Sequence, residues 1–174
     1  MKKRLLKNFT FLIYILLFGN IIIAQEQEIN TKNTVHLGVG MGLDYGGFGA
    51  KLTYKPIKEI SLFGGLGYNS IDIGWNVGLS YNIIDEGRLD ASPTIMYGYN
   101  SGLRIKNSDY NNVSYGITVG LNIILKSRKN DNNWNFGVYY PFRSKEFMDQ
   151  FYSFNEKSKI LPFTLSVGYN FRLR

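Results

Sequence analysis

The sequence has no cysteine, one histidine and only four prolines among its 174 residues. A domain without disulfides has to be held together by its own core or by a surrounding membrane. The lone histidine, His36, has neither the further ligands that a metal site needs nor an evident catalytic partner. No metal, no cofactor and no enzymatic activity are therefore expected, and a structural place for His36 is favoured.

Aromatic residues and glycine are abundant instead, with 13 Tyr, 12 Phe, 2 Trp and 19 Gly. Together with the scarcity of proline, this mixture is typical of β-strands joined by tight turns rather than of a helical bundle. The chain is long enough for one domain.

The N-terminus has the layout of a secretory signal peptide, with an apolar run behind four basic residues, Lys2, Lys3, Arg4 and Lys7. We predict cleavage after Ala24, so residues 1–24 are the signal peptide, 25–33 a periplasmic lead-in and 34–174 the folded domain. An uncleaved anchor is the alternative, but the run is interrupted and short for a span of about 20 residues.

Removal of the signal peptide changes the charge of the protein. The whole chain has 20 basic and 13 acidic side chains, a net charge of +7. The signal peptide has four of the basic ones and no acidic one, so the mature chain carries 16 − 13 = +3. The basic balance belongs largely to the export signal, and nucleic-acid binding is disfavoured.

Strict alternation of apolar and polar residues governs the rest of the chain, most clearly in residues 161–174. A period of two is typical of a β-strand with one apolar and one polar face. Eight such segments are predicted, at residues 34–45, 48–55, 59–68, 71–83, 88–99, 112–126, 134–142 and 161–174. Pro93 lacks an N–H and predicts an irregularity in the fifth segment, and residues 100–111 are predicted to form a polar loop.

The apolar face decides between a membrane barrel and a soluble one. It has five or six large side chains in most segments, more than the interior of about eight strands can hold. The other face is rich in Gly, Ser, Thr and Asn, and a soluble exterior would carry more Lys and Glu. We therefore predict an all-β fold, an eight-stranded antiparallel up-and-down transmembrane β-barrel with its apolar face in lipid.

Aromatic side chains are predicted to form two belts, as a bilayer with two interfaces requires. With both chain ends in the periplasm, the inner belt contains Tyr54, Tyr81, Trp134, Tyr169 and Phe171. The outer belt contains Tyr45, Phe48, Tyr68, Tyr97, Tyr99, Tyr115, Tyr140 and Phe142.

Charged residues on the polar face are predicted to gather in the lumen near its periplasmic end. This set consists of His36, Lys55, Glu59, Arg88, Asp90, Lys126 and Arg172, with Asp44 and Asp72 nearer the outside. Because an unpaired buried charge is costly, opposite charges in a confined lumen should pair. A plug of ion pairs is favoured over a small ion path lined by charge.

The longest connection, residues 143–160, combines basic and aromatic side chains, with a short helix as the one helical candidate. Its candidate contact residues are Arg143, Lys145, Phe147, Phe151, Tyr152 and Phe154. As an exposed loop it would contact lipopolysaccharide, a partner protein or the rim of a neighbouring barrel. Alternatively, its aromatic side chains fold over the mouth of the barrel.

The chain resembles the small outer-membrane β-barrel proteins of the OmpA/OmpX type, and more closely the porin-family "outer membrane protein beta-barrel domain" proteins of Bacteroidota. The resemblance rests on the junction at Ala24, the Gly-rich stretch 36–42 and the closing stretch 167–171. These are patterns of residue type without a catalytic signature. Such barrels usually end on an aromatic residue, whereas this chain continues past Phe171 for three residues.

The resemblance implies a bacterial outer-membrane location, contacts with lipid and lipopolysaccharide, and insertion by the barrel-assembly machinery. A structural or surface-interaction role is the leading function, with a surface or periplasmic protein as a further partner. A narrow pore is the second hypothesis. A lipid-modifying enzyme is the third and is disfavoured, since it needs a nucleophile and a base at the outer interface, and His36 is predicted at the opposite end.

Overall fold

A computed structural model of the protein describes residues 33–104, 111–128, 130, 132–154 and 160–173. The predicted signal peptide, the lead-in up to residue 32 and part of the connection after α2 lie outside these residues. The folded part belongs to one compact unit, Thr31–Arg174.

The described chain forms an antiparallel sheet that closes on itself. Its barrel strands are β1 (Thr34–Gly42), β2 (Gly47–Lys55), β3 (Ile60–Tyr68), β4 (Ile73–Tyr81), β6 (Leu89–Arg104), β7 (Asn111–Lys126), β8 (Asn133–Pro141) and β9 (Thr164–Arg172). Each strand pairs with the next, β1 pairs with β9, and pairing of β4 with β6 completes the ring. The eight-stranded antiparallel barrel predicted from the alternation is confirmed.

Three short elements complete the fold. β5 (Ile84–Glu86) forms a small hairpin with the start of β6 through a turn at Gly87, whose φ is 66°. A 3-10 turn, η1 (Leu43–Tyr45), follows β1, and the helix α2 (Lys145–Phe154) lies between β8 and β9. No helix in the described part of the chain has the length and apolar character needed to cross a membrane.

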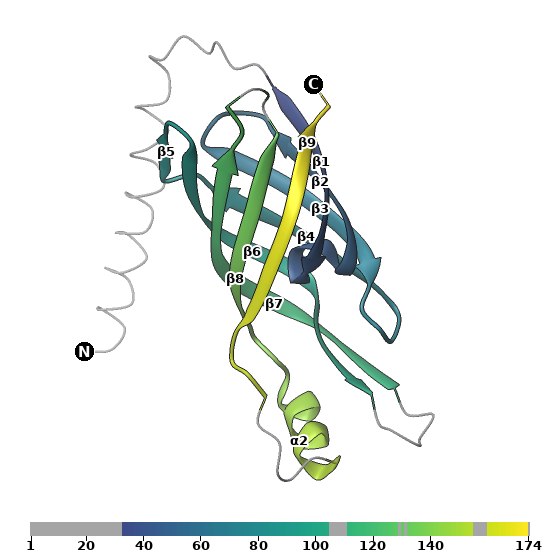
Figure 1. Cartoon of the computed structure of the whole chain (residues 1–174). Helices are drawn as coiled ribbons and strands as arrows, with labels where there is room; N and C mark the ends of the chain where they lie inside the picture. The colour runs from purple at the N-terminus through teal and green to yellow at the C-terminus, as the bar shows by residue number, and fades with distance from the viewer. Residues whose placement is uncertain (1–32, 105–110, 129, 131, 155–159, 174) are drawn as a thin grey trace, which may run out of the picture. The chain divides into compact units, whose positions relative to one another are not determined.

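The barrel has two distinct ends (Figure 1). At the terminal end, β1 begins and β9 stops, as the pairing of His36 with Arg172 shows. At the opposite end, here called the loop end, α2 and the hairpin of β6 and β7 project from the barrel. This hairpin corrects one prediction, because residues 100–104 and 111 belong to strands rather than to a loop.

No bulge occurs at Pro93, which corrects that part of a second prediction, although the pairing of β6 with β4 stops at the neighbouring residue. The pairing of Pro93 with Leu121 on β7 is in register, and the shift lies instead between Tyr99 and Ser101. The last pair between β4 and β6 joins Ser80 to Thr94. Pro93 is the first residue beyond that pairing, so its missing N–H costs no bond to β4.

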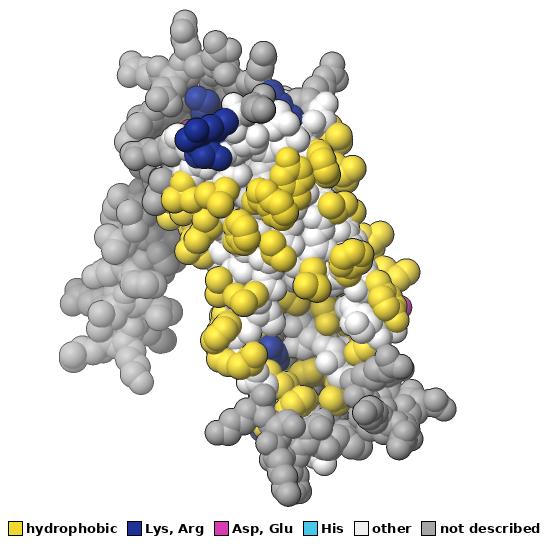
Figure 2. Space-filling view, in the orientation of Figure 1, with side chains coloured by type: hydrophobic (Ala, Val, Ile, Leu, Met, Phe, Trp, Pro, Cys, Tyr) yellow, Lys and Arg dark blue, Asp and Glu magenta, His cyan; other side chains and the backbone are white. Residues whose placement is uncertain are grey.

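Apolar side chains face outward and polar side chains face inward, as the alternation predicted. Leu66, Val77 and Ile117 on the outer face are each at least half exposed, whereas Asn76, Ser92 and Thr118 on the inner face are completely buried. Among the residues that the structure describes, buried polar and charged ones are more than twice as numerous as buried hydrophobic ones. In Figure 2 the hydrophobic side chains form a broad band over the strands.

Candidate functional site

The lumen is the candidate site, and a segment of the chain fills its centre. β1 ends at Gly42, after which Leu43, Asp44 and Tyr45 turn inward as η1, and all three are buried. The prediction that Leu43 and Tyr45 continue the strand and face outward is therefore wrong. Positive φ angles at Gly42 (140°) and Gly46 (69°) permit the chain to leave the sheet and to return.

Glycines on the inner face leave the space that η1 occupies. A Cβ atom at Gly40 would lie 2.7 Å from Cζ of Tyr45, and one at Gly38 would lie 3.3 Å from Cε1 of the same ring. At Gly168 the three nearest atoms would all belong to Tyr45. The alternate glycines of β1 thus accommodate the tyrosine that follows them in the chain.

Asp44 is the centre of a buried polar network. Its carboxylate pairs with Lys51 of β2 and accepts hydrogen bonds from Ser166 of β9 and from Nδ2 of Asn135, the last at 3.2 Å. Lys51 also lies over the Tyr45 ring, with Nζ 4.3 Å from the centroid. A buried carboxylate is tolerated only with such a cation and such donors, so η1 is held by three strands at once.

Uncharged side chains form a second group of hydrogen bonds inside the lumen. Tyr139 donates to Asn122 at 2.7 Å, and Asn122 donates to the Thr94 hydroxyl at 2.8 Å. Thr94 and Ser80 share a hydrogen bond of 2.8 Å. These residues come from the consecutive strands β8, β7, β6 and β4, so the hydrogen bonds join neighbouring strands along one side of the lumen.

Some of the predicted lumen charges lie inside the barrel, and the others lie in exposed turns. Lys126 pairs with the fully buried Asp90 at 2.8 Å, in agreement with the expected pairing. His36 is buried on β1 beside Lys55 and Arg172, which are partly buried. Glu59 and Arg88, in contrast, are exposed in turns, where Arg88 donates to the Lys126 carbonyl.

Sequence reasoning did not select Lys51, although a signal for it existed. Lys51 lies in the middle of the second predicted segment, on the polar side of its alternation. A lysine at such a position requires a buried anion. Asp44 was assigned to the polar face but toward the outside, and the direction of η1 brought the two residues together.

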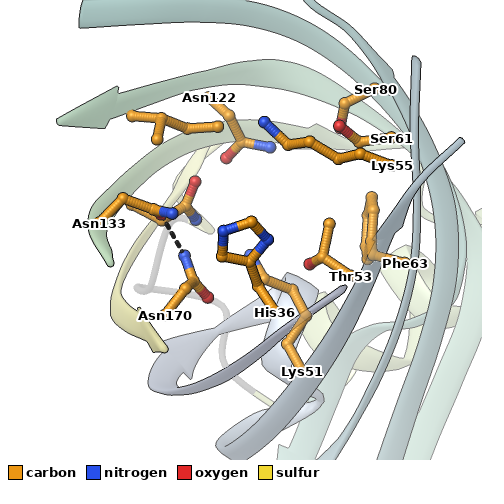
Figure 3. Close-up of a pocket in the computed structure, with 12 residues that line it drawn as sticks. His36, Lys51, Thr53, Lys55, Ser61, Phe63, Ser80, Asn122, Asn133 and Asn170 are labelled. Atoms are coloured by element: carbon orange, nitrogen blue, oxygen red, sulfur yellow. Dashed lines mark hydrogen bonds between the residues drawn. The ribbon is translucent and has the colours of Figure 1, made fainter. Parts of the chain in front are cut away.

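A cavity remains between η1 and the terminal end. Its volume is about 30 Å³, and it is lined by His36, Lys51, Thr53, Lys55, Ser61, Phe63, Ser80, Asn122, Ile124, Asn133, Asn135 and Asn170. Figure 3 shows Lys55 extending toward Asn122, with the His36 ring in the middle of the group. Asn170 donates to Asn133 at 2.7 Å across one side. No group of three or more His, Cys, Asp or Glu side chains suited to a metal occurs among the described residues.

At the loop end, the predicted contact segment is partly folded against the barrel. Phe147 of α2 is buried and Phe151 is partly buried, whereas Lys145 and Tyr152 are exposed. Gln150 accepts a 2.6 Å hydrogen bond from Asn112, which lies near the tip of the β6–β7 hairpin. The side chain of Phe154 lies outside the described residues. The helix therefore presents a mixed charged and tyrosine face to the surroundings.

Arg143 fixes the start of this segment. Its Nε donates to the Ser101 hydroxyl at 2.7 Å and its Nη1 donates to the Leu161 carbonyl at 2.8 Å. Partial burial lowers the pKa of the Arg143 guanidinium, but the group remains charged at neutral pH because its usual pKa is so high. Arg143 is thus a structural link between β6 and the approach to β9.

Comparison of the chain with family models, with curated proteins and with solved structures gave no match.

Proposed function

We propose that this protein is a bacterial outer-membrane β-barrel with a plugged lumen and a structural or surface-interaction role. It is exported by a signal peptide comprising residues 1–24 and inserted by the barrel-assembly machinery. Its partners are membrane lipid and lipopolysaccharide, together with a surface or periplasmic protein at one of its ends. It has no catalytic role.

The observation that carries this proposal is the inverted distribution of polar and apolar side chains. In water, exposure of apolar surface costs roughly 25 cal/mol per Å², and monomeric soluble proteins rarely expose large continuous apolar patches. Here large aliphatic and aromatic side chains are exposed on every barrel strand, while asparagine, serine and threonine fill the interior. Hydrocarbon is the solvent that suits such a surface.

Aromatic residues support two membrane interfaces. Toward the loop end, the Trp75 ring lies 5.7 Å from that of Tyr115 and 6.2 Å from that of Tyr97. Toward the terminal end, the Tyr169 ring lies 5.0 Å from Trp134 and 4.9 Å from Phe171. Tyr45 is buried and Tyr99 partly buried, so neither is an exposed member of the predicted outer belt.

The filled lumen favours a plug over a pore. The residues of η1 occupy the centre of the barrel, where the Leu43 carbonyl accepts a hydrogen bond from Asn76 and the Asp44 carboxylate accepts one from Asn135. Eight strands leave an interior only just wide enough for side chains, so little room remains for a continuous water path.

A lipid-modifying reaction would require reactive groups at the outer interface. His36 lies instead at the terminal end and is buried. Loss of a lipid-modifying activity in a His36→Ala variant would contradict the non-enzymatic proposal.

Fractionation combined with gel mobility tests the proposal. The full chain, expressed in a Gram-negative host, should appear in the outer-membrane fraction with its N-terminus at Gln25. Without boiling, it should migrate differently from the boiled sample, because a closed barrel resists detergent. The urea-unfolded protein is the control and should show no difference. Recovery as a soluble periplasmic protein would overturn the proposal, and steady conductance in planar bilayers would replace the plug by a pore.

A further inference from the structure

We propose that the terminal end of β6, β7, β8 and β9 binds the phosphate headgroup of one phospholipid, whose acyl chains lie along the outer face of these strands. A row of apolar side chains and two exposed arginines directly beyond it form the site. The inference rests on the proposed function, because it requires the outer face to be in a membrane. It adds which group of the lipid the barrel recognises and where.

The apolar row crosses the four strands in the register of the sheet. Leu89 pairs with Leu125, Leu125 with Trp134, and Trp134 with Tyr169. Residues paired in this way lie side by side on one face, here the outer face, where the two leucines and the tryptophan are each at least 40% exposed. The ring centroids of Trp134 and Tyr169 are 5.0 Å apart. Tryptophan and tyrosine in such a row are typical of the boundary between lipid chains and headgroups.

Arg88 and Arg128 lie directly beyond this row, and both side chains are exposed. Arg88 is two strands away from the start of β8 and immediately precedes β6, where its Nε atom donates to the Lys126 carbonyl at 3.2 Å. Arg128 lies in the turn from β7 to β8, which a 2.8 Å backbone hydrogen bond closes. In Figure 2 Lys and Arg side chains gather at the terminal end, next to the hydrophobic band.

The charge of the four strands leaves these arginines for an external partner. The strands contain one carboxylate, Asp90, which is completely buried and pairs with Lys126 at 2.8 Å. The adjoining stretches of the sequence also contain Asp85, Glu86 and Asp131. Recognition therefore depends on hydrogen bonds from the guanidinium groups to phosphate rather than on a high net charge.

The chemistry of arginine at a membrane boundary favours a phospholipid. A planar guanidinium binds phosphate oxygens in pairs, and its apolar stem can lie along lipid chains while its head reaches the polar region. In a phospholipid, the phosphate lies directly beyond the acyl chains. A lipid whose chains cover the apolar row would therefore bring its phosphate to the arginines. With both chain ends in the periplasm, this end of the barrel faces the phospholipid leaflet.

The two tryptophans of the chain, Trp134 beside the site and Trp75 toward the loop end, allow a matched test. The full chain carrying Trp75→Phe is folded in a maltoside detergent and checked by its gel shift. It is titrated with phosphatidylglycerol brominated on its acyl chains or with diacylglycerol carrying the same chains, since bromine quenches tryptophan fluorescence on contact. The phospholipid should quench Trp134 at a concentration about fivefold to tenfold lower. In Trp134→Phe, Trp75 should respond equally to the two lipids.

Removal of either arginine should weaken the preference for the phospholipid. In the Trp75→Phe background, Arg88→Gln and Arg128→Gln should each raise the quenching concentration of phosphatidylglycerol about twofold to fivefold. Lys58→Gln is the matched control, because Lys58 is exposed at the same end in the turn after β2, away from the apolar row. It should leave the quenching unchanged. If Arg88→Gln does not show the gel shift of a folded barrel, Arg128→Gln decides the test alone.

Three results would overturn the proposal. They are equal quenching of Trp134 by the two lipids, an equal loss in the control variant, and reversal of the quenching by inorganic phosphate at the concentration of the lipid. The last result would identify a site for free phosphate instead of a lipid. Because the barrel is folded in detergent, such a failure leaves the membrane assignment untouched, and fractionation with gel mobility tests that separately.

Discussion

The two faces of the barrel wall follow opposite rules, although the same strands build both. On the outer face, side chains such as Val77 and Leu165 make a surface that needs no hydrogen bonds. On the inner face, side chains such as Asn122 and Asp44 are buried, and each is hydrogen-bonded to another side chain inside the lumen. The stability of this barrel therefore depends on hydrogen bonding of the polar groups inside it and on whether water or lipid surrounds its outer face.

The largest loss of unfolding free energy is expected from removal of the buried negative charge in the Asp44 network. Asp44→Asn keeps the shape of the side chain but leaves the Lys51 ammonium buried without its carboxylate. Removal of one partner of a buried ion pair costs about 3–5 kcal/mol of unfolding free energy. Urea titration of the gel-shifted form measures this loss.

The matched control removes both charges. The double variant Asp44→Asn, Lys51→Met should regain most of the lost unfolding free energy, because replacement of a whole buried pair is often close to neutral. A double variant no more stable than Asp44→Asn alone would show that the ion pair is not the source of the effect.

An arginine on the outer face should have the next largest effect, and only if that face contacts lipid. Val77 and Ile73 lie on the same strand and the same face, Val77 at mid-strand and Ile73 at its loop-end limit. In a bilayer, Val77→Arg should lower the unfolding free energy by about 2–4 kcal/mol and Ile73→Arg by about 0–1 kcal/mol.

Folding in lipid vesicles with urea titration gives both values. If the face is in water, neither arginine is buried and the two variants should be alike. Equal small effects would therefore remove the strongest support for a membrane location.

The smallest effect is expected from replacing single glycines by alanine, one on the inner face and one on the outer face. The added methyl group should be tolerated only where no side chain lies against the glycine. Gly168→Ala would place a Cβ against the Tyr45 ring and should cost about 1–3 kcal/mol of unfolding free energy, as overpacking does. Gly64→Ala on the outer side has only a Val77 methyl group 4.0 Å away and should be nearly neutral. Urea titration of both variants makes the comparison, and equal costs would contradict the assignment of the inner glycines to the space that Tyr45 needs.

The strands were predictable because a period of two is a local property. The second predicted segment, 48–55, differs from β2 by one residue, and the sixth, 112–126, differs from β7 by one residue. The helix α2 falls on the one stretch that carried a helical candidate. In the candidate site, pairing of opposite lumen charges was expected from the need to neutralise buried charge, and the structure identifies Asp90 with Lys126 as such a pair.

The inward turn of η1 could not be predicted locally, because the alternation of the first segment continues through Leu43 and Tyr45. Contacts with distant parts of the chain hold it: Asn76, 33 residues away, donates to the Leu43 carbonyl, and Ser166, 122 residues away, donates to Asp44. Closure between β4 and β6, the filling of the lumen by η1 and the remaining cavity all depend on such contacts. The sequence by itself determined which residues form strands and which side faces outward, since alternation needs no partner. Only the tertiary structure decided what fills the lumen, since that depends on which strands, distant in the sequence, come to surround η1.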